Sequence, residues 1–214
     1  KSFELDLIFS KLPATSIDTI VTRTLVALAI GGALRSSEYT SPSKHPSKDE
    51  LIRLVRLDRL VRFKDAQGHN SMVFFFFKSK KNQTYKTEFA VMPCVCKDDL
   101  PCAFHETLKL EAILKNAKPN TYLFTWQDGS FVTYPETLNI FKNMASLIGI
   151  NIDQIGTHSA RKARISIGIK QGLPDTVLLQ LGRWKSLESI KPYIQLGPMD
   201  LNTALQAKPF KAKA

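Results

Sequence analysis

The sequence predicts an α+β domain that is mainly helical and carries a small three-stranded antiparallel sheet. Segments before residue 35 and after residue 102 repeat apolar residues at helical spacing. Between them, three consecutive segments at 54–63, 71–77 and 84–92 have the composition of strands and are separated by turn residues. The 214 residues, of which 43% are hydrophobic, suffice for one domain with a core, or for one domain and a small appendage.

The chain is expected to begin with helices. Residues 3–11 predict a short helix that ends before Pro13. Ser16 or Thr19 is expected to cap a second helix over 17–34, which closes near a Gly pair at 31–32. A new helix starts within 33–38, and residues 41–49, rich in Pro, Ser and Lys, predict an exposed loop.

The middle of the chain predicts the sheet. Apolar and charged residues alternate over 54–63, as in a half-exposed strand, and a turn at 65–70 leads to an apolar strand over 71–77. Lysines mark a hairpin tip at 78–83, before the chain returns over 84–92. The C-terminal half predicts a helix at 103–116 and another at 133–148, which ends at Gly149. The next helix starts at 157 or 159 and ends at 172–174. Asp175 or Thr176 is expected to cap a helix at 177–181, and the tail predicts a last helix at 201–207.

The charge balance is basic, which fits nucleic acid or an acidic membrane surface as a partner, or solubility alone. Lys and Arg number 30 against 19 Asp and Glu, which gives a net charge of +11 and a pI near 9.6. No apolar segment approaches the ~20 residues that a membrane-spanning helix needs. The N-terminus lacks the layout of a signal peptide and does not begin with Met, so we expect an intracellular protein excised from a longer chain.

The three cysteines lie close together, at positions 94, 96 and 102, with a histidine at 105. An odd number of cysteines fits a reducing compartment better than a disulfide framework. The pattern Cys-x-Cys-x5-Cys-x2-His is not one of the common zinc spacings. A zinc site is the alternative, but from the sequence we expect buried or idle thiols and no metal.

Residues 156–193 hold side chains whose chemistry suits a phosphodiester. His158 and Arg161 are three apart, so a helix places both on one face, where a guanidinium fork matches phosphate oxygens. Trp184 offers an indole N–H donor. Tyr193 follows nine residues later (193 − 184) and is a phenol that can act as a covalent nucleophile. Each residue alone is more simply a core or surface residue, but the ordered set indicates a site.

The spacing of His158-x-x-Arg161, Leu-Gly-Arg-Trp at 181–184 and Tyr193 resembles the catalytic C-terminal half of the tyrosine recombinase (phage integrase-type) family. The texture is similar to eukaryotic mobile-element and viral members. Upstream, Ala-Leu-Arg-Ser-Ser-Glu at 33–38 is similar to the family's G-L-R-x-x-E element, with Ala33 in place of Gly. Arg183 likewise stands where many members have Gly. The resemblance implies a catalytic domain over 1–195, a tail at 196–214 that can serve as a subunit-exchange helix, and a chain without the family's N-terminal DNA-clamp domain.

The resemblance also implies a reaction on double-stranded DNA. Tyr193 would attack the scissile phosphorus and form a 3′-phosphotyrosyl link, while Arg35 and Arg161 clamp the non-bridging oxygens. The remaining expected roles are general acid for Lys80, with Lys78 and Lys81 as alternatives, hydrogen-bond donors for His158 and Trp184, and an orienting carboxylate for Glu38. The chemistry needs no ATP, metal or small-molecule cofactor, and the expected assembly is a homotetramer on DNA.

Two other functions fit the same fold. One is a DNA-binding protein that no longer cuts, against which the intact set of six expected catalytic residues argues. The other is a type IB-like topoisomerase, which uses the same tyrosine chemistry without site specificity.

Overall fold

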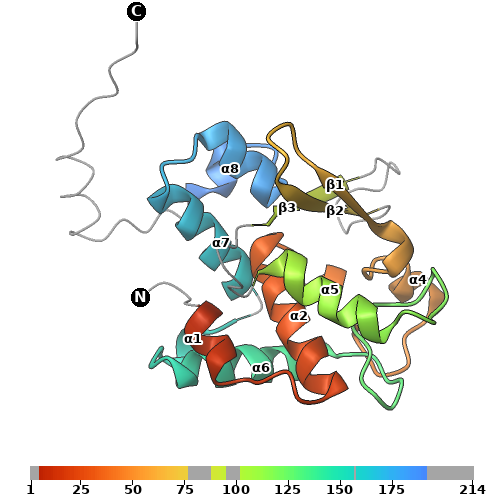
Figure 1. Ribbon diagram of the computed structural model, residues 1–214. Coiled ribbons are helices and arrows are strands. Elements are labelled where there is room, and N and C mark those ends of the chain that lie inside the picture. The colour runs from red at the N-terminus through yellow and green to blue at the C-terminus, as the bar shows by residue number, and fades with distance from the viewer. Residues whose placement is uncertain (1–4, 77–87, 95–101, 157, 192–214) are drawn as a thin grey trace, which may run out of the picture.

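A computed structural model describes residues 5–76, 88–94, 102–156 and 158–191 of the chain (Figure 1). The described part is mainly helical with one three-stranded antiparallel sheet, which confirms the predicted α+β class. No helix within it is both long and apolar enough to cross a membrane.

Helix α2 (Ile17–Gly31) is the centre of the hydrophobic core. The Ser16 side chain accepts a hydrogen bond from the backbone N–H of Thr19, so Ser16 is the cap among the two residues that the sequence predicted for this role. Most of the helix is buried, and it packs against α5 (Ala103–Ile113) and α7 (Ser159–Lys170) (Figure 1). A Cβ at Gly31 would lie 2.9 Å from Cβ of Ala103, so glycine permits the close approach of α5.

A buried ion pair connects α1 (Leu5–Ser10), α2 and α5. Arg23 donates two hydrogen bonds of 2.9 Å to the carboxylate of Glu106, and its Nη1 donates to the carbonyl oxygens of Phe9 and Leu12. The Glu106 side chain is fully buried. Because every oxygen of this carboxylate is paired, the charge is tolerated in the core.

The sheet consists of β1 (Leu60–Lys64), β2 (Asn70–Phe76) and β3 (Glu88–Pro93), in that order and antiparallel. Its inner face packs against α5 and is buried at Met72, Phe74 and Met92. Glu88 stands opposite Phe76 on this same face, because directly paired residues share a face.

The first strand starts later than the sequence predicted. Residues 54–59 do not join the sheet; they include the 3₁₀ turn η1 (Leu57–Arg59) and pair elsewhere. The backbone N–H of Val55 donates to the backbone carbonyl of Glu38, and that of Leu57 donates to the backbone carbonyl of Thr121. The alternating pattern therefore reflects burial of Leu54 and Val55 in the helical core rather than strand pairing with β2.

Short helices follow α2. Helix α3 comprises Ser36–Tyr39, and α4 comprises Lys48–Leu51, so the predicted loop at 41–49 ends two residues early. Glu50 accepts hydrogen bonds from the backbone N–H and hydroxyl of Ser47, and this capping pair starts α4. The longer helix α6 (Tyr134–Leu147) is followed by the turn η2 (Ile152–Gln154).

Helix α8 (Asp175–Gly182) and the turn η3 (Leu187–Ser189) complete the described chain. The predicted cap at Asp175 or Thr176 was wrong: Pro174 occupies the N-cap and the helix begins at once, because proline has no N–H that would need a partner. Ile165, Leu178 and Ile190 form a second small core between α7, α8 and the segment after them.

Candidate functional site

Arg35 lies where the chain turns from α2 into α3. Ala33 has a left-handed backbone with φ of 46°, and Arg35 then occupies the N-cap of α3. The backbone N–H of Arg35 donates to Glu38 Oε2 at 2.7 Å. Glu38 is 3% exposed, so this carboxylate holds the start of the helix from inside the protein.

The guanidinium of Arg35 is held by three acceptors. Nη1 donates to Glu38 Oε1 at 3.1 Å and to Glu88 Oε2 at 2.7 Å, and Nη2 donates to the carbonyl oxygen of Arg183 at 3.3 Å. Burial alone would lower the pKa of Arg35, but the carboxylates of Glu38 and Glu88 outweigh it and raise the pKa above the ordinary guanidinium value. Arg35 therefore keeps its charge.

Arg161 reaches the same turn from α7. It is 5% exposed, and its Nε donates to the carbonyl oxygen of Ala33 at 3.0 Å. Its guanidinium carbon lies 5.5 Å from the centre of the Trp184 ring, within the range of a cation–π contact. Two arginines that are far apart in the sequence thus meet at residues 33–38, as expected from the ordered motifs.

Arg183 is a third arginine of this site, and the sequence did not assign it a role. Its Nη2 donates to Glu38 Oε2 at 2.7 Å and to the carbonyl oxygen of Ala33 at 3.4 Å, and its guanidinium lies 4.8 Å from the Phe76 ring. Its side chain is 7% exposed. The sequence did contain an indication of this role, because an arginine stands where many members of the family that the sequence resembles have glycine.

Glu88 is the second residue without a predicted role. It lies in phase with Ala90 and Met92 of β3, which are buried on the inner face. A carboxylate on the buried, apolar face of a strand indicates that a cationic or hydrogen-bonding partner lies nearby, because an unpaired charge is costly to bury. The site, defined here as Arg35, Glu38, Glu88, Arg161 and Arg183, holds three guanidinium groups and two carboxylates.

Trp184 packs tightly at the end of α8. A Cβ at Gly182 would lie 2.1 Å from the indole ring, so only glycine leaves room for the ring here. The Gly-Arg-Trp sequence therefore combines a close approach at residue 182, a left-handed backbone at Arg183 with φ of 50°, and the ring beside Arg161.

His158 occupies the N-cap of α7, and its side chain is exposed. Among the described residues no hydrogen bond joins its ring to the arginines, although it lies one turn before the buried Arg161 on the same helix. Tyr193, Lys80, Lys78 and Lys81 lie outside the described residues. Their expected roles stay predictions.

Comparison with known proteins gives no matching family model and no matching curated protein. Solved structures do match. A XerH site-specific recombinase in a post-cleavage complex with its difH substrate has a TM-score of 0.67 at 15% identity, over 95% of this chain and 49% of the other. The described chain has the tyrosine recombinase fold.

Two further recombinase structures show the same fold. A Flpe–Holliday junction complex has a TM-score of 0.53 at 12% identity, over 95% of this chain and 48% of the other. The XerA recombinase has a TM-score of 0.51 at 14% identity, over 92% of this chain and 65% of the other. The chain therefore spans about half the length of the XerH and Flpe chains that it matches.

Proposed function

We propose that this chain is the catalytic domain of a tyrosine recombinase, which cleaves and rejoins double-stranded DNA through a 3′-phosphotyrosyl intermediate. The observation that carries the proposal is the convergence of Arg35 and Arg161 on the turn at residues 33–38, within a fold shared with site-specific recombinases. The sequence motifs predicted both arginines independently of the structure.

In this proposal Arg35 and Arg161 bind the non-bridging oxygens of the scissile phosphate. Guanidinium groups suit this role because their planar forks donate paired hydrogen bonds and they stay charged at every physiological pH. Glu38 and Arg183 position them. Glu38 accepts from both Arg35 and Arg183, and the Ala33 carbonyl accepts from both Arg161 and Arg183.

Tyr193 is the proposed nucleophile. Tyr39 also lies near the arginines, but it is 1% exposed, and burial raises the pKa of its phenol far above the ordinary value. A protonated, buried phenol cannot reach a DNA strand. Tyr193 is the tyrosine at the family's spacing from Trp184, and the clustered positive charge would favour its phenolate.

The other proposed roles follow the family pattern. Lys80 protonates the leaving 5′-oxygen, and His158 and Trp184 donate hydrogen bonds to the phosphate. His158 also helps to remove the proton of the phenol. Because the phosphotyrosyl link conserves the energy of the cleaved bond, the residues themselves suffice for a reaction without ATP or metal. A homotetramer on DNA, with residues 196–214 exchanged between subunits, and an intracellular location at the DNA complete the proposal.

Covalent trapping tests the proposal. The full-length protein and this chain are incubated at low salt with a duplex that carries a phosphorothiolate at one candidate cleavage position, and DNA–protein adducts are then counted after denaturation. We expect an adduct for the wild type and none for Tyr193→Phe. Arg161→Ala should lower the trapping rate by about 10²–10³, the usual effect of losing one donor to a developing oxyanion.

The matched control is Tyr134→Phe, because Tyr134 is an exposed tyrosine at the start of α6. It should trap at the wild-type rate. Tight DNA binding without an adduct, both for the full-length protein and for this chain, would contradict the enzyme and favour the silent DNA-binding protein. Relaxation of supercoiled DNA without any sequence preference would instead favour the topoisomerase.

A further inference from the structure

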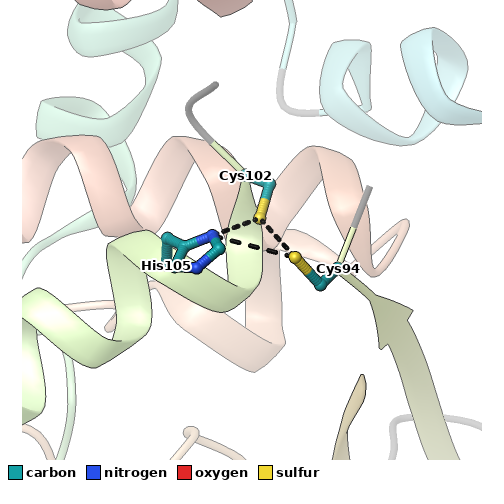
Figure 2. A group of neighbouring side chains, drawn as sticks. All are labelled: Cys94, Cys102 and His105. Carbon is teal, nitrogen blue, oxygen red and sulfur yellow. Dashed lines mark hydrogen bonds between the residues drawn. The ribbon is translucent and has the colours of Figure 1, made fainter. Parts of the chain in front are cut away.

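The structure brings together three side chains that the proposed function does not use. Cys94, Cys102 and His105 lie between the end of β3 and the start of α5, with their sulfur and nitrogen atoms turned toward one another (Figure 2). The two sulfurs are 4.0 Å apart, and Nδ1 of His105 lies 3.8 Å from Cys94 Sγ and 3.4 Å from Cys102 Sγ.

These separations are those of ligands around one zinc ion. With Zn–S of about 2.3 Å, Zn–N of about 2.0–2.1 Å and tetrahedral angles, two sulfurs lie about 3.8 Å apart and a sulfur and a nitrogen about 3.6 Å apart. Each observed distance is within about 0.3 Å of these values. A disulfide would need the sulfurs at about 2.05 Å, so the thiols are not bonded to each other.

The backbone holds all three residues in this arrangement. The N–H of Cys94 donates to the Asn70 carbonyl at 2.8 Å and so extends the pairing of β3 with β2. Cys102 is the N-cap of α5, and His105 follows three residues later, which puts both on one face of the helix. Glu106, the next residue, is turned to Arg23 on α2.

The burial of the two cysteines and the types of the three ligands suit a bound zinc ion. Cys102 is 3% exposed and Cys94 is half-buried, so both sulfurs are shielded from bulk water. Two thiolates and one imidazole are a ligand set that selects zinc over harder cations such as magnesium.

We propose that Cys94, Cys102 and His105 form a zinc-binding site that joins the end of β3 to the start of α5. Binding of Zn²⁺ displaces one proton from each thiol, and three protein ligands leave one tetrahedral position for a further ligand. The sequence spacing favoured idle thiols, because it does not show that the strand end and the helix start meet. This inference does not depend on the proposed recombinase activity.

The test uses zinc itself on the full-length, reduced protein after treatment with a chelator. Zinc per chain is measured in competition with a chromophoric chelator, and Co²⁺ is used as a spectroscopic probe. We expect one Zn²⁺ per chain and a cobalt spectrum with thiolate charge-transfer and tetrahedral d–d bands. Zinc at about 100 times its dissociation constant should raise Tm by about 5–10 °C.

Cys94→Ser is the main variant, since this side chain is half-buried and the exchange of sulfur for oxygen is small. Its zinc affinity should fall by more than ~100-fold, because changes to groups behind the ligands already lower affinity by about 10–100-fold. His69→Asn is the matched control, as His69 is an exposed hairpin histidine, and it should bind zinc like the wild type. Circular dichroism checks that both variants are folded.

Three results would overturn the proposal. The first is a folded Cys94→Ser variant that binds zinc as tightly as the wild type. The second is a wild type that binds no zinc. The third is a disulfide between Cys94 and Cys102 in peptide mass maps of protein purified under reducing conditions, since a bonded pair cannot supply two thiolates. Tyr193→Phe should bind zinc like the wild type, because the metal site and the nucleophile are separate.

Discussion

In the proposed site, the carboxylate of Glu88 competes with the DNA phosphate for Arg35. Arg35 Nη1 donates to two carboxylates, and the shorter of these hydrogen bonds, at 2.7 Å, goes to Glu88. The two side chains are 20% and 24% exposed, so a DNA phosphate can reach this pair from solvent. If Arg35 binds the phosphate, it must share or give up its bond to Glu88. We therefore predict that Glu88→Gln strengthens DNA binding.

The magnitude follows from two terms. A carboxylate and a phosphate about 5 Å apart repel by roughly 3 kcal/mol at an effective dielectric constant of about 20, and salt reduces this. Loss of the partly exposed ion pair removes only about 0.2–1 kcal/mol of stability. If salt leaves about 1–1.4 kcal/mol of this repulsion in the wild-type complex, its removal in Glu88→Gln makes DNA binding about five- to tenfold tighter. The fold should therefore tolerate the change while affinity rises.

The assay is fluorescence anisotropy of a labelled duplex, titrated with wild type, Glu88→Gln and Asp153→Asn. Asp153 is an exposed acid in η2 and is not one of the five residues of the site, so its replacement by Asn changes the net charge by the same amount. The advantage of Glu88→Gln should shrink as salt is raised. If Glu88→Gln binds DNA no better than Asp153→Asn, or loses adduct formation, then Glu88 holds Arg35 in place and the competition argument fails.

Two further predictions concern packing and charge. Gly182→Ala should displace the indole of Trp184, lower the free energy of unfolding by about 1–3 kcal/mol and shift the tryptophan emission. Gly156→Ala is the control, because its Cβ would meet open space, and it should change neither quantity. Equal emission spectra for the two variants would refute the close approach of Trp184 to Gly182. Glu106→Gln should lower the free energy of unfolding in urea by about 3–5 kcal/mol, because Arg23 stays buried without its carboxylate. Burial alone would raise the pKa of Glu106, but hydrogen bonds from Arg23 and Lys109 outweigh it and lower the pKa. The difference in stability between wild type and Glu106→Gln should therefore be complete above pH about 4.3, the pKa of Glu in an unfolded chain, and should be lost as the pH falls through the lowered pKa of Glu106. A difference that grew as the pH fell would contradict this assignment.

The sequence predicted the parts of the fold that local chemistry decides. Ser16 caps α2, the turn at 65–70 joins β1 to β2, and α6 begins after Thr133, whose capping pair with Glu136 is a local pattern. It failed where a distant partner decides. Residues 54–59 alternate like a strand, but Leu57 pairs with Thr121, far along the chain, and no local pattern reveals that.

The site shows the same division. Arg35 and Arg161 could be predicted because each belongs to a short sequence motif and the motifs follow one another in a fixed order. The structure brings both arginines to residues 33–38. Arg183 and Glu88 were missed because their importance lies in contacts with Glu38 and Arg35, which come from other elements. The cysteine cluster was undervalued for a related reason: its meaning depends on where β3 ends relative to α5.

The two departures from the family pattern are connected in the structure. Ala33 and Arg183 are the two non-glycine residues with positive φ in the described chain. Both stand where the motifs of the family that the sequence resembles have glycine. Such a backbone costs about 1–2 kcal/mol per residue. At Ala33 the same turn presents a carbonyl that accepts from Arg161 and Arg183, and at Arg183 the carbonyl accepts from Arg35. Hydrogen bonds from charged donors contribute about 1.5–3 kcal/mol each, so they offset the strain. The strained turns and the arginines therefore stabilise each other, and changing either should disturb the whole site rather than one contact.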